Sequence, residues 1–101
     1  MKKTVTPVNP TLIPVVVTTE HKGVFFGYIK PGDVAEKTAR IEKARMCISW
    51  SSDMGGVLGL GSIGPSPSCK IGPAVPALTL QAITAVIEAS PEAAAKWDAA
   101  K

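Results

Sequence analysis

The stretch Gly61-Ser62-Ile63-Gly64-Pro65-Ser66-Pro67-Ser68-Cys69-Lys70-Ile71-Gly72-Pro73 divides the chain and organises what lies on either side of it. It contains three glycines, three prolines, three serines and one charged side chain, that of Lys70. Glycine allows backbone angles that other residues avoid, whereas proline fixes its own φ and restrains the residue before it. We therefore predict a shaped loop. Its exposed amides and hydroxyls beside one ammonium group suit a bound anion, and they suit a tight connection without a ligand equally well.

Length and composition indicate one small globular domain with a single modest core. The chain has 101 residues, 46% of them hydrophobic, and a net charge of +3 that does not by itself indicate nucleic-acid binding. We interpret residues 1–11 as a flexible N-terminal arm and residues 12–101 as a single α+β domain. No apolar run matches a signal peptide or the roughly 20 residues of a membrane span, so we expect a cytoplasmic protein without a membrane partner.

The cysteine and histidine content limits metal and redox chemistry. In the cytoplasm Cys47 and Cys69 are expected to remain thiols. Two cysteines and one histidine cannot complete a four-ligand zinc site within one chain, so we expect no metal and no other cofactor.

The distribution of charge is more informative than its total. Between Met46 and Ile87 the only charged side chains are those of Asp53 and Lys70; the others lie in residues 1–45 and 88–101. A small domain cannot bury so long a segment completely, because too much of its surface must face water. We predict that part of this segment contacts another chain and that the protein is a homo-oligomer.

The N-terminal half has the pattern of strands. Residues 13–19 and 24–29 are rich in β-branched and aromatic side chains, and the turn at 20–23 makes them a hairpin. Gly27 within the second strand indicates a bulge or a close backbone approach. Residues 34–43 fit a helical turn or an edge strand. Residues 44–50 then alternate with a period of two, which predicts a third strand with Trp50 on its apolar face and Arg45 on the opposite face.

The C-terminal half combines strands and helices. Residues 51–53 resemble a helix N-cap, and 54–60 fit either a short middle helix or a glycine-rich turn. Residues 69–71 predict a short strand, and 78–88, which also suit a helix, are predicted to form one long strand because they are rich in β-branched residues. Ser90-Pro91-Glu92 begins a C-terminal helix anchored by Trp97. The predicted fold is α+β: an antiparallel sheet of about five strands, curled toward a partly closed barrel, with one or two short helices.

No catalytic motif is present, so we predict a protein that is not an enzyme. We therefore interpret the candidate residues as ligand-binding groups rather than catalytic ones. For Lys70, Arg45 and Trp50 a purely structural role is the alternative. Lys70 suits a phosphate or is a solvated lysine at a strand edge; Arg45 reaches a second phosphate or pairs with Glu42 or Glu20. Trp50 stacks a base or belongs to the core. The full set is Lys70, Ser66, Ser68, Arg45, His21 and Trp50.

Several segments, in order, resemble a widespread family of small phage proteins. They are 18–27 (TTEHKGVFFG), 44–46 (ARM), 64–66 (GPS), 69–72 (CKIG), 83–86 (ITAV) and Trp97 in its alanine-rich helix. The likeness covers residues 15–97, and the family resembles the phage sponges that sequester cyclic nucleotide signals of CBASS-type bacterial immunity. The resemblance implies a homo-oligomer in the host cytoplasm that binds a cyclic di- or trinucleotide at a subunit boundary without turnover.

Two other functions fit the same residues. A protein-binding accessory factor would dock on a host or phage protein through the charge-poor surface, and Lys70 would then be incidental. Nucleic-acid binding through residues 22–45 is disfavoured because Glu36 and Glu42 interrupt the basic residues there.

Overall fold

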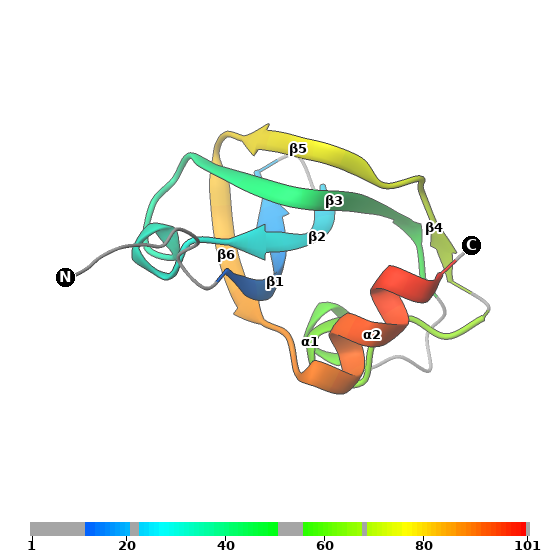
Figure 1. The fold of residues 1–101 in the computed structure, drawn as a ribbon. Helices are drawn as coiled ribbons and strands as arrows, with labels where there is room; N and C mark the ends of the chain where they lie inside the picture. The colour runs from blue at the N-terminus through cyan, green and yellow to red at the C-terminus, as the bar shows by residue number, and fades with distance from the viewer. Residues whose placement is uncertain (1–11, 21–22, 51–55, 68, 101) are drawn as a thin grey trace, which may run out of the picture.

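The computed structural model describes residues 12–20, 23–50, 56–67 and 69–100 (Figure 1). The arm at 1–11 and the N-cap at 51–53 that the sequence predicted lie outside these residues. Six strands and two α-helices follow one another, with a short 3₁₀ turn at Pro31–Asp33 after the second strand: β1 Ile13–Thr19, β2 Val24–Ile29, β3 Ala39–Ser49, α1 Gly56–Ser62, β4 Lys70–Ile71, β5 Val75–Leu80, β6 Ile83–Glu88 and α2 Pro91–Ala99.

The strands form one antiparallel sheet in which β3 is the longest member. The order is β4-β3-β2-β1-β6. Strands β5 and β4 both pair with the edge of β3 that faces away from β2: β5 pairs with the first half of β3 and β4 with its last residues. The predicted α+β class is confirmed, with six strands rather than about five. The sheet curls so that β5 and β6 are joined by only two residues, yet no ladder between these described strands closes it into a barrel (Figure 1).

The prediction of one long strand at 78–88 is wrong. Ala82 has a φ of 56°, a left-handed backbone that interrupts an extended strand. As a result Leu80 pairs with Ala39 of β3, whereas Ile83, three residues later, pairs with Thr19 of β1. The β-branched composition was correct for strands, but it does not reveal where a strand changes its partner.

The predicted hairpin and its glycine are confirmed. β1 and β2 pair in regular register from Ile13 opposite Ile29 to Thr18 opposite Val24. A β-carbon on Gly27 would lie 2.7 Å from Ile41 Cδ1, so the backbone approach requires glycine. The β2–β3 register shifts in the same region, where Lys43 has a φ of 51°. This bulge turns both Ile41 and Ala44 toward the same hydrophobic cluster.

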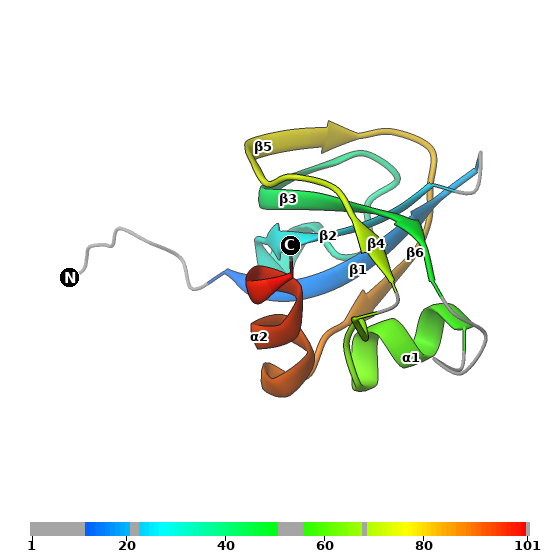
Figure 2. The same ribbon diagram turned by 90° about the vertical axis from the view of Figure 1, so that its right-hand side faces the viewer.

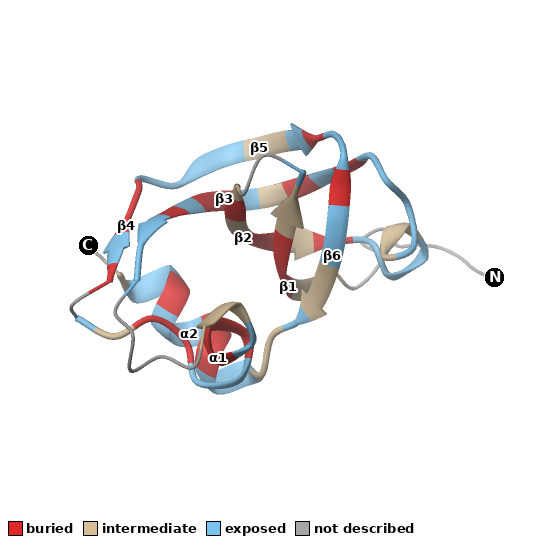
Figure 3. Cartoon of the chain, turned by 180° about the vertical axis from the view of Figure 1, so that it is seen from behind, coloured by how far each residue is buried: buried red, intermediate tan, exposed pale blue. Residues whose placement is uncertain are grey.

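Two hydrophobic clusters lie on the two faces of the sheet. Both helices lie on one side of the sheet (Figure 2), and buried segments occur on the strands and on the helices (Figure 3). The cluster inside the curl contains Val15, Val17, Ile29, Ala39, Ile41, Ala44, Leu80 and Ile83. The other lies between the opposite face and the helices, and contains Val16, Val24, Phe26, Cys47, Leu60, Cys69, Ile71, Ala94 and Trp97. Because successive strand residues alternate between faces, neighbouring residues such as Val15 and Val16 contribute to different clusters.

The C-terminal helix forms as its sequence predicts. The Ser90 hydroxyl accepts a hydrogen bond from the Ala93 amide at 3.0 Å, and Pro91 occupies the first helical position. Trp97 is fully buried and donates from Nε1 to the carbonyl of Leu60 at 3.0 Å, which ties α2 to α1. The short middle helix is also present as α1, despite its glycines.

The predicted faces of β3 are wrong at its C-terminal end. Arg45 and Cys47 are buried, whereas Met46, Ile48 and Trp50 are exposed. At this end the core lies under the helices, on the face of Arg45 and Cys47; the cluster inside the curl ends at Ala44. The alternation of apolar side chains was therefore real, but the apolar side of the strand end faces solvent.

Candidate functional site

Lys70 and Trp50 are brought together by the pairing of β3 with β4. Lys70 lies opposite Ser49 in the ladder, and Trp50 directly follows Ser49. The Lys70 side chain is exposed, and Trp50 retains 37% of its accessible surface. The backbones of Lys70 and Trp50 thus lie at one corner of the sheet, and both side chains are exposed. That pair suits a ligand that carries both a negative charge and a flat ring.

Ser66 belongs to the internal structure of the loop. Its carbonyl accepts the Cys69 amide at 3.0 Å, and its hydroxyl lies 3.7 Å from the Cys69 sulfur. The half-buried hydroxyl thus faces the loop's own turn, and Ser66 lies four residues before Lys70, which begins β4. Ser68 and His21, the other two predicted polar residues, lie outside the described residues.

Arg45 has a structural role. Its guanidinium donates to three carbonyls, those of Gly72 at 2.8 Å, Trp97 at 2.8 Å and Ala100 at 2.6 Å. The side chain is buried, and its partners are carbonyls rather than the carboxylates of Glu42 or Glu20. It fastens the end of the 61–73 loop to the last turn of α2, where carbonyls lack helical partners. Arg45 is therefore not available as a second phosphate ligand.

A surface of exposed apolar side chains surrounds the Lys70–Trp50 corner. We call Met46, Ile48, Trp50 and Val75 the apolar end. Val75 lies opposite Ala44 across the β3–β5 ladder, and the Gly72 amide donates to the Met46 carbonyl at 2.8 Å, so the four belong to one end of the sheet. Among the described residues, every exposed large hydrophobic side chain falls between Met46 and Val75. From the alternation in the sequence, Met46 and Ile48 were assigned to the buried face of the strand. The shortage of charged residues from position 46 onward was the signal that could have indicated an exposed apolar surface here.

The two cysteines are buried thiols that belong to the core. Burial, and secondarily the nearby Cys69, raises the pKa of Cys47 from 9.0 to about 11. The thiol is therefore protonated near neutral pH, which is the opposite of what a nucleophilic cysteine requires. No group of three possible metal ligands occurs within residues 12–20, 23–50, 56–67 and 69–100.

A polar contact on the helix side also has a structural role. The Tyr28 hydroxyl donates to Asp98 Oδ2 at 2.5 Å, and the Lys43 ammonium lies 5.9 Å from the centre of the Tyr28 ring. Burial, followed by the bond to Asp98, raises the pKa of Tyr28 from 10.0 to about 12. This contact links α2 to β2 and holds the tyrosine in its neutral form.

Comparison with known proteins gives one match. Residues 12–97 match a family described as a domain of unknown function, DUF6948. No curated protein and no solved structure matches the chain. The described helices include none long and apolar enough to span a membrane.

Proposed function

We propose a function for this chain, which belongs to the DUF6948 family: it is a non-enzymatic phage protein that binds a cyclic di- or trinucleotide in the host cytoplasm and withholds it from antiviral defence. The observation that supports the binding site is the register that sets Lys70 opposite Ser49, the residue before Trp50. The choice of ligand rests on the resemblance to phage sponges. The bound molecule would leave unchanged, because the described residues of the site supply a cation and an aromatic side chain but no activated nucleophile.

The chemistry of the corner defines the ligand by two requirements. The Lys70 ammonium suits a phosphate oxygen, and the exposed Trp50 indole suits a base, since every base has a face that stacks. Arg45 is held by three carbonyls, so Lys70 is the cation that the described part of each chain offers here. A cyclic dinucleotide has two phosphates and two bases. Two copies that meet through Met46, Ile48 and Val75 would supply a matched pair of groups for it.

Calorimetric titration with a panel of cyclic di- and trinucleotides tests this function. Lys70→Ala is expected to weaken binding by about 1.5–3 kcal/mol through the loss of a charged hydrogen bond. Lys30→Ala, which removes an exposed lysine just after β2, is the control and should bind like the wild type. Ligand-induced quenching of tryptophan fluorescence should disappear in Trp50→Phe, because Trp97 is fully buried. The absence of heat with every ligand at tens of micromolar protein would refute the proposal.

A second function is favoured by the apolar end itself. Met46, Ile48 and Val75 are exposed, and they belong to a segment, residues 46–87, whose only charge among the described residues is Lys70; this composition is typical of a contact with another protein. In this function the chain docks on a host or phage protein. Capture from host lysate by the wild type, but not by Met46→Ser/Ile48→Ser, would support it. Unchanged capture by Lys70→Ala would separate docking from nucleotide binding.

A further inference from the structure

Strand β6 has an edge that no described strand pairs. It ends the sheet order and pairs only with β1. The Ala89 amide donates to the Pro14 carbonyl at 2.9 Å; because amides alternate in direction along an antiparallel ladder, those of Val86 and Glu88 point away from β1. At the other end of the strand, the Ile83 amide donates to the Lys37 carbonyl at 2.9 Å. Lys37 therefore borders the same open edge.

The two outer edges of the sheet differ in how they resist pairing. β5 carries Pro76, which has no amide to donate and discourages a neighbouring strand. β6 contains no proline, and its single charge, on Glu88, lies at its end. Helix α1 packs beside it, since a β-carbon on Gly61 would lie 2.7 Å from Ile87 Cγ2. On α1 and just after it, Leu58 (69% exposed) and Ile63 are exposed apolar side chains.

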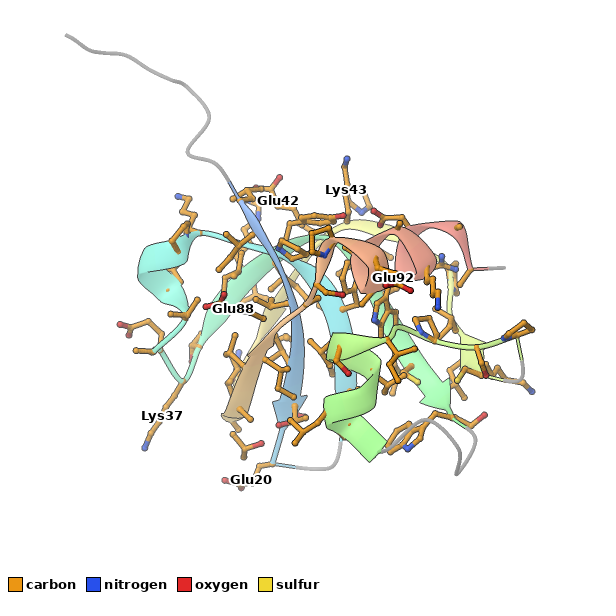
Figure 4. All side chains as sticks on the ribbon, turned by 90° about the horizontal axis from the view of Figure 1, so that it is seen from below. Glu20, Lys37, Glu42, Lys43, Glu88 and Glu92 are labelled. Carbon is orange, nitrogen blue, oxygen red and sulfur yellow. The ribbon has the colours of Figure 1, made fainter. Side chains whose placement is uncertain are left out.

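We propose that a second copy of this chain pairs with β6 through this edge, antiparallel and about a two-fold axis at Val86. The two Val86 residues then exchange backbone hydrogen bonds, and Glu88 of each copy lies opposite Thr84 of the other. Thr84 adjoins Ile83, whose amide donates to the main-chain carbonyl of Lys37. In the proposed dimer the Glu88 end of each copy therefore faces the Lys37 end of the other, and their opposite charges pair. Figure 4 shows the two side chains at opposite ends of β6. The symmetry creates two such ion pairs.

The complementary charges identify the occupant as the chain itself. A two-fold contact requires a surface that is complementary to itself, and an acid at one end of the strand with a base at the other meets that requirement. The backbone amide of Glu20 donates a hydrogen bond to the Ala82 carbonyl near the Lys37 end, but from the β1 side of β6. The contact lies across the sheet from β4, so it does not depend on the function proposed for Lys70 and Trp50.

Charge reversal tests the contact, because both residues are exposed and neither is needed for the core. Light scattering coupled to size exclusion should show dimers of the wild type, while Lys37→Glu or Glu88→Lys alone should raise the dissociation constant by at least about tenfold through paired like charges. Mixing the two variants restores two attractive pairs and should restore dimers of one copy each. The double variant should dimerise with itself. Lys30→Glu, the same change of charge after β2, should behave as the wild type.

Each outcome decides the proposal. Recovery in the mixture and in the double variant supports pairing between copies, because a folding defect in one chain cannot be repaired by the other. Failure of the mixture to dimerise would overturn it, as would a wild type that stays monomeric at about 100 µM. Dimers that are lost in Met46→Ser/Ile48→Ser but kept in both charge reversals would assign self-association to the apolar end instead.

Discussion

The two tryptophans mark two regions with opposite physical roles. Trp97 is fully buried, stacks on Phe26 with ring centres 5.1 Å apart and planes 5° apart, and donates to the Leu60 carbonyl. Trp50 lies at the apolar end and keeps 37% of its surface exposed. Similar side chains therefore stabilise the fold in one region and are available for binding in the other. Stability and binding should consequently respond to different substitutions.

The largest expected difference is between the tryptophans themselves. Trp97→Ala should lower the free energy of unfolding by about 3–5 kcal/mol, because it leaves a cavity between α2, α1 and the sheet. Trp50→Ala should change it by no more than about 0.5 kcal/mol, as is usual for surface positions. Urea denaturation followed by circular dichroism measures both without relying on tryptophan fluorescence. Equal losses would mean that Trp50 belongs to the folded core.

The two basic residues of the predicted site should divide in the same way. Arg45→Met removes three hydrogen bonds to carbonyls and should cost about 2–3 kcal/mol of stability. Arg45→Lys should recover only part of this, because an ammonium cannot reproduce the planar fork of donors. Lys70→Met should leave the urea midpoint unchanged and affect ligand binding alone. A stable Arg45→Met protein with weakened binding would instead place Arg45 in the site.

Two glycines allow a matched test of how far backbone conformation and close packing contribute to stability. Gly64 has a φ of 90°, and a β-carbon there would lie 2.9 Å from Ala93 Cα, so Gly64→Ala should cost about 2 kcal/mol. A β-carbon at Gly32 meets nothing within 4 Å, so Gly32→Ala should be neutral or stabilise by about 0.4–1 kcal/mol. Thermal melts of the two variants compare them directly. A tolerated Gly64→Ala would show that the loop does not depend on its contact with α2.

The smallest expected effect on the free energy of unfolding comes from two raised pKa values, and it can be measured only at alkaline pH. The folded pKa of Cys47 is about 11 and that of Tyr28 about 12, both above their ordinary values of 9.0 and 10.0. A raised pKa means that folding favours the protonated form, so its contribution to stability is complete below pH 9 and is lost as the pH rises toward 12. Tyr28→Phe should reduce this loss in urea titrations between about pH 10 and 12, the range between the ordinary and the folded pKa of this tyrosine. An identical slope in the variant would exclude Tyr28 as its source.

Much of the fold could be predicted from sequence because its signals are local. The β-branched run at 13–19, its hairpin partner and the Ser90-Pro91-Glu92 cap all report the conformation of their own residues, and all are confirmed. The sequence did not decide between a helix and a turn for residues 54–60, because glycine lowers helix propensity. The contact between Leu60 and Trp97 that stabilises this helix involves residues far apart in the chain. The break at Ala82 was missed because the sequence favours strands on both sides of it.

The candidate site divides along the same line. Lys70 and Trp50 were identified from the sequence as separate groups, and only the strand register sets Lys70 opposite Ser49, the residue before Trp50. Arg45 was predicted as a ligand because nothing near it in sequence indicates the three carbonyls that hold it. Those carbonyls come from residues 72, 97 and 100, far from residue 45 in the chain.

By itself, the sequence determined the elements that depend on local backbone preference, the helix cap and the charge-poor segment that becomes the apolar end. Only the tertiary structure decided which face of each strand is buried, and therefore that Trp97 packs in the core while Trp50 meets solvent. The physical reason is that an alternating strand offers two faces, and the choice between them depends on where the helices lie. For the end of β3 they cover the face of Arg45 and Cys47, which leaves Met46, Ile48 and Trp50 free to meet a partner.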